Sequence, residues 1–160
     1  MSCSRHTRRG LLLGALALGA CGFRPAYGPD GAGRFRHATA ITTPATPEGY
    51  RLLARLEDRL GPAREARWYL DVTLDISESR ASYGEDDSIG RATLLGDATW
   101  RLTDGADGPL VGEGRARGFT GYDSGLVNTV ALRADARDAQ ERLAVMLADA
   151  VVTQMLALGE

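Results

Sequence analysis

The sequence predicts an α+β fold: a two-layer sandwich in which a four-stranded, mostly antiparallel sheet is covered on one face by two helices. Two segments, 67–77 and 91–103, alternate between apolar and polar residues, which is typical of half-buried strands. Two others, 46–60 and 128–158, repeat apolar residues every three or four positions, as amphipathic helices do. One face of the sheet is apolar and needs a cover, and the two helices supply it.

The first strand is expected from Arg34 to Thr42, followed by the first helix. Alternate residues of that strand share one face: Phe35, His37, Thr39 and Ile41. Thr46 can cap the helix, Pro47 suits the first helical position, and Glu48 favours the positive end of the helix dipole. The helix carries an apolar stripe of Leu52, Leu53, Leu56 and Leu60. Gly61-Pro62 is expected to end it.

Two strongly alternating strands come next. The strand Arg67–Ser77 has an apolar face of Trp68, Leu70, Val72, Leu74 and Ile76. A polar loop is expected over Ser79–Gly90. The strand Arg91–Thr103 then has an apolar face of Ala92, Leu94, Ala98, Trp100 and Leu102. The Asp and Gly residues within Asp104–Pro109 predict a tight hairpin connection to the next strand.

The fourth strand, Leu110–Thr120, and the last helix, Asn128–Leu158, complete the fold. One strand face holds only small residues: Gly112, Gly114, Ala116 and Gly118. These glycines weaken a strand but allow a helix to approach closely. The helix has an apolar stripe of Leu132, Ala136, Ala139, Leu143, Leu147, Val151, Met155 and Leu158. From Val145 onward it is apolar nearly all round, which predicts further burial by its own sheet or by another protein.

The N-terminus reads as an export signal that ends at Cys21. Basic residues come first, and the ten residues Leu11–Ala20 contain only Leu, Ala and Gly. Ten helical residues rise about 15 Å, too little to span a hydrocarbon core of about 30 Å. Cleavage is expected between Ala20 and Cys21. A plain secretory signal with an incidental cysteine is the alternative.

The segment Leu18–Cys21 resembles the lipobox of bacterial lipoproteins. The resemblance implies that Cys21 carries a diacylglycerol and an acylated amino group, which anchor the chain in a membrane. It divides the chain into a signal (1–20), a lipidated leader rich in Gly and Pro (21–33) and a single domain (34–160). Thr7–Leu12 also resembles a twin-arginine signal, so both the general and the twin-arginine export routes stay open.

Composition argues against several other functions. Three of the 19 basic residues lie in the signal, leaving 16 against 21 acidic residues and a net charge of −5 after cleavage. No basic patch favours nucleic acid. His37 is the one histidine after Cys21, and the acidic run at 85–87 lacks the ligand spacing of a calcium loop. We therefore expect no catalytic residue, no metal site and no cofactor.

Three arginines are the remaining candidates for a site. Arg101, Arg115 and Arg117 are expected to project from neighbouring strands on the polar face of the sheet, surrounded by other polar residues: Glu113, Thr73, Thr99 and Asp97. One interpretation is a solvated face held by cross-strand ion pairs. The other is a binding face for an anionic or polar partner, gripped by guanidinium forks because the chain has no lysine.

Two motifs and the order of elements resemble the LptE-like family of LPS-assembly lipoproteins. The motifs are Cys21–Pro25 (CGFRP) with Tyr27-Gly28, and 134–142 (ADARDAQER); the order is strand, helix, three strands, helix. The resemblance implies an outer-membrane lipoprotein that plugs a large β-barrel delivering lipopolysaccharide to the cell surface, assists assembly of that barrel and contacts lipopolysaccharide. Gly22, where inner-membrane lipoproteins often have Asp, agrees with the outer membrane. The family supplies no catalytic residue, so only Cys21 is carried over, and Arg101, Arg115 and Arg117 remain candidate contacts.

Two alternatives stay open beside this resemblance. One is an auxiliary lipoprotein of another envelope lipid transporter, which would differ in the membrane and partner with which it co-purifies. The other is a periplasmic hydrolase acting on lipid or glycan. The absence of a paired nucleophile and base counts against the hydrolase.

Overall fold

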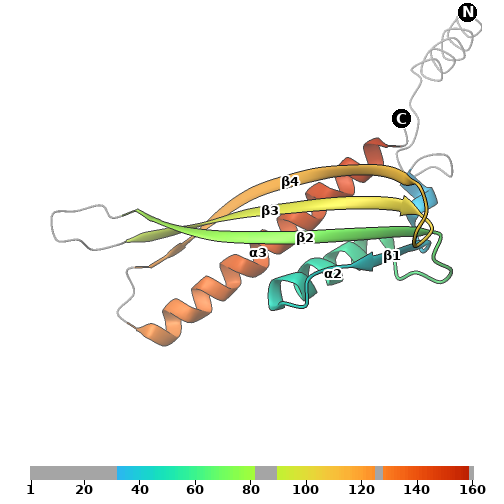
Figure 1. Ribbon diagram of the computed structural model, residues 1–160. Helices are drawn as coiled ribbons and strands as arrows, with labels where there is room; N and C mark the ends of the chain where they lie inside the picture. Colours follow the sequence, from blue (N-terminus) through green and yellow to red (C-terminus); the bar gives the residue numbers. More distant parts are fainter. Residues whose placement is uncertain (1–31, 82–89, 125–127, 159–160) are drawn as a thin grey trace, which may run out of the picture.

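The computed structural model describes residues 32–81, 90–124 and 128–158. They form an elongated two-layer domain, with four strands on one side and two helices on the other (Figure 1). The elements in chain order are η1 (Ala32–Phe35), β1 (Thr39–Thr42), α2 (Pro47–Leu60), β2 (Trp68–Ala81), β3 (Arg91–Asp104), β4 (Leu110–Asp123) and α3 (Thr129–Ala157). The predicted α+β sandwich is therefore confirmed.

The sheet has the order β1-β2-β3-β4. β2, β3 and β4 are antiparallel neighbours, whereas β1 pairs in parallel with the first residues of β2. The parallel pair follows from α2, because a helix between two strands carries the chain back to the end of the sheet where the first strand began. The second strand then runs in the same direction as the first. The sheet is mixed in this one place and antiparallel elsewhere.

Both ends of α2 are as the sequence predicts. The Thr46 hydroxyl accepts a hydrogen bond from the Gly49 amide at 3.1 Å, with Pro47 at the start of the helix. At the other end Gly61 has a φ of 77°, and its amide donates to the Glu57 carbonyl at 2.7 Å. The buried face holds Leu52, Leu56 and Leu60, so α2 contributes a row of leucines to the core.

The first strand is shorter than predicted. Only Thr39–Thr42 pairs with β2, and the segment before it forms the short 3-10 helix η1 and a turn. His37 has a positive φ of 57°, which breaks any extended run, and the Thr39 hydroxyl donates to the Phe35 carbonyl at 2.8 Å. The turn allows Phe35 to be fully buried against Trp68, with the ring centroids 5.4 Å apart. Burial of this aromatic ring overrides the alternating pattern.

The later strands are longer than predicted. β2 continues to Ala81, so the expected polar loop does not begin at Ser79. Ser79–Ala81 pairs with 91–93 of β3, and β4 likewise continues to Asp123 opposite Arg91. Cross-strand pairing carries these polar residues into the sheet despite their composition. The rest of the expected loop, 82–89, lies outside the described residues.

α3 packs closely against the glycine-rich strands. A Cβ built on Gly96 would lie 2.9 Å from Leu143 Cδ2, and one built on Gly112 would lie 2.5 Å from Leu158 Cδ1. The predicted close approach of a helix to the small-residue face of β4 is thus confirmed. The fully or nearly fully buried residues of α3 are Ala139, Leu143, Ala144, Leu147, Ala148, Val151, Val152 and Met155.

α2 covers a second side of α3, which explains why α3 is apolar nearly all round. Asp149 of α3 receives Arg55 Nε at 3.1 Å and Arg59 Nη1 at 2.6 Å, both from α2. The hydrogen bond from Arg55 to Asp149 is the largest cause of a raised pKa of the Arg55 guanidinium. Between them, α2 and the sheet bury the C-terminal half of α3. Of the two explanations considered from the sequence, burial within this chain and burial by another protein, the first therefore accounts for its apolar surface.

Candidate functional site

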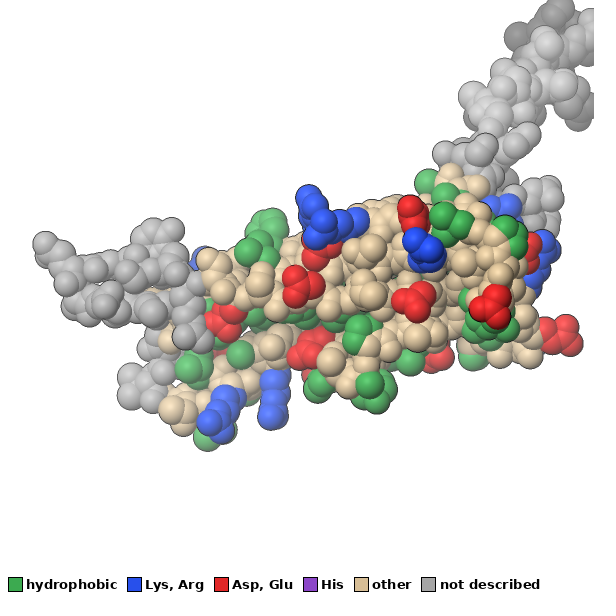
Figure 2. Space-filling view, in the orientation of Figure 1, with side chains coloured by type: hydrophobic (Ala, Val, Ile, Leu, Met, Phe, Trp, Pro, Cys, Tyr) green, Lys and Arg blue, Asp and Glu red, His purple; other side chains and the backbone are tan. Residues whose placement is uncertain are grey.

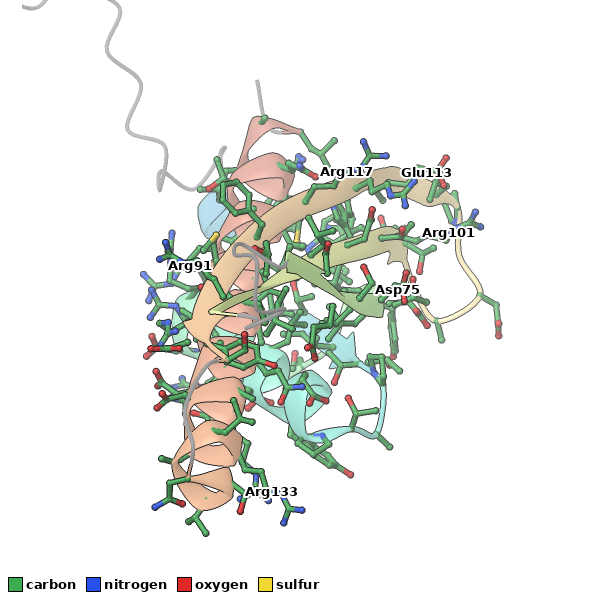
Figure 3. The ribbon with its side chains drawn as sticks, turned by 90° about the vertical axis from the view of Figure 1, so that its left-hand side faces the viewer. Asp75, Arg91, Arg101, Glu113, Arg117 and Arg133 are labelled. Carbon is green, nitrogen blue, oxygen red and sulfur yellow. The ribbon has the colours of Figure 1, made fainter. Side chains whose placement is uncertain are left out.

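The outer face of the sheet carries all three predicted arginines. Figure 3 shows Arg101 on β3 and both Glu113 and Arg117 on β4 at this side of the sheet, whereas Arg133 lies far away on α3. In register, Arg101 lies opposite Glu113, Arg115 opposite Thr99, and Arg117 opposite Asp97. The sequence therefore places the three side chains correctly on one surface.

Asp97 of β3 is the centre of this surface. It is held by the Nε groups of Arg115 and Arg117, the latter at 3.2 Å. Its side chain is only 19% exposed, whereas those of Arg115 and Arg117 are 55% and 70% exposed. The hydrogen bond from Arg115 is the largest of the causes that lower the pKa of the Asp97 carboxyl. The same contact raises the pKa of the Arg115 guanidinium.

Carboxylates neutralise the arginines on every side. Arg101 pairs with Glu113 at 3.2 Å, and Asp71 lies opposite it on β2. Asp75 lies opposite Asp97, so two carboxylates share the space in front of Arg115 and Arg117. In Figure 2, acidic and basic side chains are interspersed over the surface of the strands. The geometry matches a face held by cross-strand ion pairs and offers no cluster of uncompensated positive charge.

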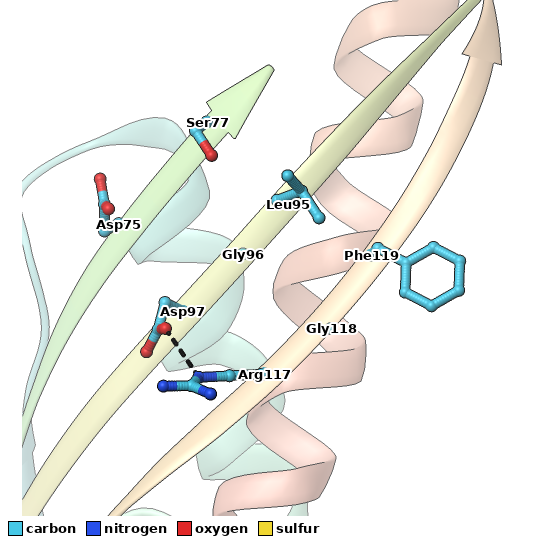
Figure 4. A pocket seen from close by; sticks show the side chains of 8 residues that line it. All are labelled: Asp75, Ser77, Leu95, Gly96, Asp97, Arg117, Gly118 and Phe119. Carbon is cyan, nitrogen blue, oxygen red and sulfur yellow. Dashed lines mark hydrogen bonds and ion pairs between the residues drawn. The ribbon is translucent and has the colours of Figure 1, made fainter. Parts of the chain in front are cut away.

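A hollow of about 310 Å³ opens beside this network, and its apolar wall is not foreseen by the sequence analysis (Figure 4). Its lining residues are Asp75, Ser77, Leu95, Gly96, Asp97, Arg117, Gly118 and Phe119. Phe119 is 70% exposed and Leu95 is 48% exposed, and the two lie opposite each other in register. In the strand alternation, Leu95 and Phe119 belong to the same set of positions as Asp97 and Arg117. The sequence pattern could therefore have shown that this apolar pair lies on the charged face.

Residues 32–81, 90–124 and 128–158 were predicted to contain no metal site. No group of three or more His, Cys, Asp or Glu is placed to hold a metal ion in that part of the chain. His37 Nδ1 lies 3.4 Å from the Pro62 carbonyl oxygen.

The predicted anchor and cleavage residues, Cys21 and Ala20, lie outside the described residues, so both remain predictions. In the described part, neither of the two α-helices is long and apolar enough to cross a membrane.

The fold is similar to that of several bacterial lipoproteins of known structure. A protein from Caulobacter crescentus, assigned as a lipoprotein, is 26% identical with a TM-score of 0.65, covering 82% of this chain and 98% of its own. Rare lipoprotein B from Shewanella oneidensis has a TM-score of 0.58 at 10% identity, with 75% and 92% covered. A minor lipoprotein from Acinetobacter baumannii has a TM-score of 0.55 at 12% identity, with 76% and 91% covered.

The last two similarities show the fold alone, because the identities are low. No protein-family model matches the chain, and no curated protein matches it.

Proposed function

We propose that this chain is an outer-membrane lipoprotein, anchored through Cys21, that plugs and helps to assemble the β-barrel delivering lipopolysaccharide to the cell surface. The observation that carries the proposal is the lipobox-like Leu18–Cys21 directly before a domain whose fold occurs in bacterial lipoproteins. The CGFRP leader at 21–25 supports the finer assignment through its resemblance to LPS-assembly lipoproteins.

The outer sheet face has the chemistry that a plug requires. The lumen of a large outer-membrane barrel is polar and lined by charged side chains. A plug surface of paired charges can exchange partners with such a wall without leaving a buried charge uncompensated. Arg101, Arg115 and Arg117 are partly exposed, and the ion pair of each uses only part of its guanidinium, so each can also donate an N–H hydrogen bond to a carboxylate or phosphate oxygen of the partner.

The exposed pair Leu95 and Phe119 supplies the apolar anchor of the same contact. Interfaces draw most of their binding energy from a few aromatic or arginine residues surrounded by near-neutral contacts. Phe119 beside Arg117 and the 310 Å³ hollow fits that arrangement. We therefore place the centre of the barrel contact at Phe119, with the ion-paired arginines around it.

Co-purification from outer membranes solubilised in mild detergent tests this proposal. The wild-type lipoprotein is expected to bring down a large β-barrel protein in stoichiometric amount. Phe119→Ala should reduce recovery of the barrel several-fold, because it removes the anchor. Tyr50→Ala is the matched control: Tyr50 is 61% exposed but lies on α2, on the opposite layer, and its removal should leave recovery unchanged.

Recovery of the lipoprotein with no barrel would contradict the plug. Recovery with an inner-membrane transporter instead would favour an auxiliary lipoprotein of another lipid-transport system. Equal barrel recovery with Phe119→Ala and wild type would leave the plug but move the contact away from this sheet face.

A further inference from the structure

β1 covers only the start of one edge of the sheet. It pairs with Trp68–Asp71, whereas β2 continues past it to Ala81 (Figure 1). The pairing of β2 with β3 keeps one register from Trp68 to Ala81 without a bulge, and 72–81 contains no proline. Bulges and prolines are two of the devices that prevent an edge strand from pairing further. Beyond β1, the edge of β2 therefore keeps the regular geometry that an additional strand needs.

The hydrogen bonds at the start of β2 show which of its residues present backbone groups to this edge. The Gly105 amide, directly after β3, donates to the Arg67 carbonyl at 2.8 Å, and the Trp68 amide donates to the Ala38 carbonyl, directly before β1, at 3.0 Å. Odd-numbered residues therefore bond to β3, and even-numbered residues point to the side of β1. The unbroken register preserves this alternation along β2.

Leu74 and Ile76 are the even-numbered residues that follow the part paired with β1. Their side chains are only partly buried against the core, whereas Leu70 and Val72 on the same face are 1% and 2% exposed. No strand of the described chain pairs with β2 on this side beyond Asp71. We call residues 73–77 the open edge. A strand added there would bond to the backbone groups of Leu74 and Ile76 and cover both side chains.

We propose that the open edge binds an extended segment of the barrel partner, which adds a fifth strand to the sheet. The inference rests on the proposed barrel partner. An extended chain offers donors and acceptors at the spacing of a strand edge, whereas a helix uses its backbone groups internally. The wall strands of a closed barrel are already paired on both sides, so the segment belongs to a loop or an extension of the barrel protein. Its alternate residues should be apolar, next to Leu74 and Ile76.

Charge distinguishes this occupant from a second copy of the chain. Asp75 is exposed on the outer face of the open edge and forms no ion pair within the described ranges. Its neighbours in the same row, Thr73, Ser77 and Ser79, are uncharged. Two copies joined edge to edge into one continuous antiparallel sheet would place this row against itself and bring no cation to Asp75. A segment of another chain can supply that cation, which favours the barrel partner.

Residue-resolved hydrogen–deuterium exchange tests the pairing on the full-length lipoprotein, alone and in the complex with the co-purified barrel. In the lipoprotein alone, the amides of Leu74 and Ile76 should exchange roughly tenfold faster than those of Thr73, Asp75 and Ser77, which bond to β3. In the complex, exchange at Leu74 and Ile76 should slow by about tenfold or more. The odd-numbered amides are the internal control, because they are bonded in both states.

Amides of Leu74 and Ile76 that remain fast in the complex would overturn the inference and leave the plug in place. Protection that is already present in the lipoprotein alone would also overturn it. Native mass spectrometry then identifies the occupant, since a mass of two chains means a second copy and a mass of one chain means a segment of this protein. A lipoprotein that brings down no barrel refutes the proposed function, and this inference with it.

The variants Ile76→Pro and Ile76→Ala separate the backbone from the side chain. Proline removes the amide that faces the open edge and none of the hydrogen bonds to β3, which is why an edge strand tolerates it. Ile76→Pro should therefore lower recovery of the barrel several-fold relative to Ile76→Ala, which keeps the amide. Equal recovery with both variants, when circular dichroism shows both to be folded, would overturn the inference. If the proline variant does not fold, the exchange pattern of the wild type decides.

Discussion

Leu143→Ala tests whether α3 is the cover of the sheet. Leu143 is fully buried and lies under two strand glycines, because Cβ atoms built on Gly96 and Gly118 would be 2.9 Å and 3.5 Å from its methyl groups. Removing a buried leucine side chain costs about 2–5 kcal/mol, and more where the surroundings cannot collapse into the cavity. Glycines have no side chain to fill the space, so we expect about 4 kcal/mol.

Urea unfolding of the domain 22–160, followed by circular dichroism, measures this loss. At about 4 °C per kcal/mol for a domain of this size, Tm should also fall by roughly 15 °C. Met146→Ala is the control on the next turn of the same helix, since Met146 is 45% exposed and should cost less than about 1 kcal/mol. A cost below about 1 kcal/mol for Leu143→Ala as well would mean that α3 does not cover these strands in solution.

Three further substitutions test separate parts of the account. Asp97→Asn should destabilise the domain at neutral pH, because its paired carboxylate has a lowered pKa. The stability that the pair contributes is present above the unfolded pKa and is lost as pH falls through the folded pKa, so the difference between the unfolding curves of the variant and the wild type should begin to shrink below about pH 4. A difference that stays constant as the pH falls would refute the ion pairs. The Trp100 indole N–H donates to the Gln154 side-chain oxygen at 2.7 Å, and Gln154→Ala removes this acceptor. The free energy of unfolding should fall by about 1–3 kcal/mol in chemical unfolding, and no change would mean that water replaces the amide. Cys21→Ala should abolish palmitate labelling while Cys3→Ala retains it, and labelling that persists without Cys21 would refute the lipobox assignment.

Much of the fold could be predicted because local signals and tertiary contacts agree. The cap at Thr46 and the glycine at 61 are local signals, and the structure uses both. The alternation over 67–77 and 91–103 defines one apolar face. Its residues are buried in β3, whereas in β2 the burial is full for the first half and partial for Leu74 and Ile76. The misassigned part of the first predicted strand is 34–38, where burial of Phe35 against Trp68 outweighs a short alternating pattern. No local signal in that segment specifies a contact with a residue more than thirty positions away.

The candidate site was predicted in part. Alternation places Arg101, Arg115 and Arg117 on one face, but pairing of two of them with a single carboxylate depends on the register between β3 and β4. The polar residues of α3 were visible as interruptions of an apolar helix. In the structure, Asp149 forms ion pairs with two arginines of α2, and the Gln154 amide donates to the Arg115 carbonyl at 3.1 Å. These partners lie on α2 and β4, far from α3 in the sequence. A single sequence therefore shows that polar residues interrupt the apolar helix but does not show what they bind.

The central claim is that the outer sheet face touches a barrel, and site-specific photo-cross-linking in living cells tests it most directly. A photoreactive residue replaces Thr99, which lies on that face, or Tyr50, which is exposed on α2. The account predicts a high-mass adduct with an outer-membrane β-barrel protein from position 99 and little or none from position 50. Adducts from position 50 alone, or none with any barrel from position 99, would contradict it.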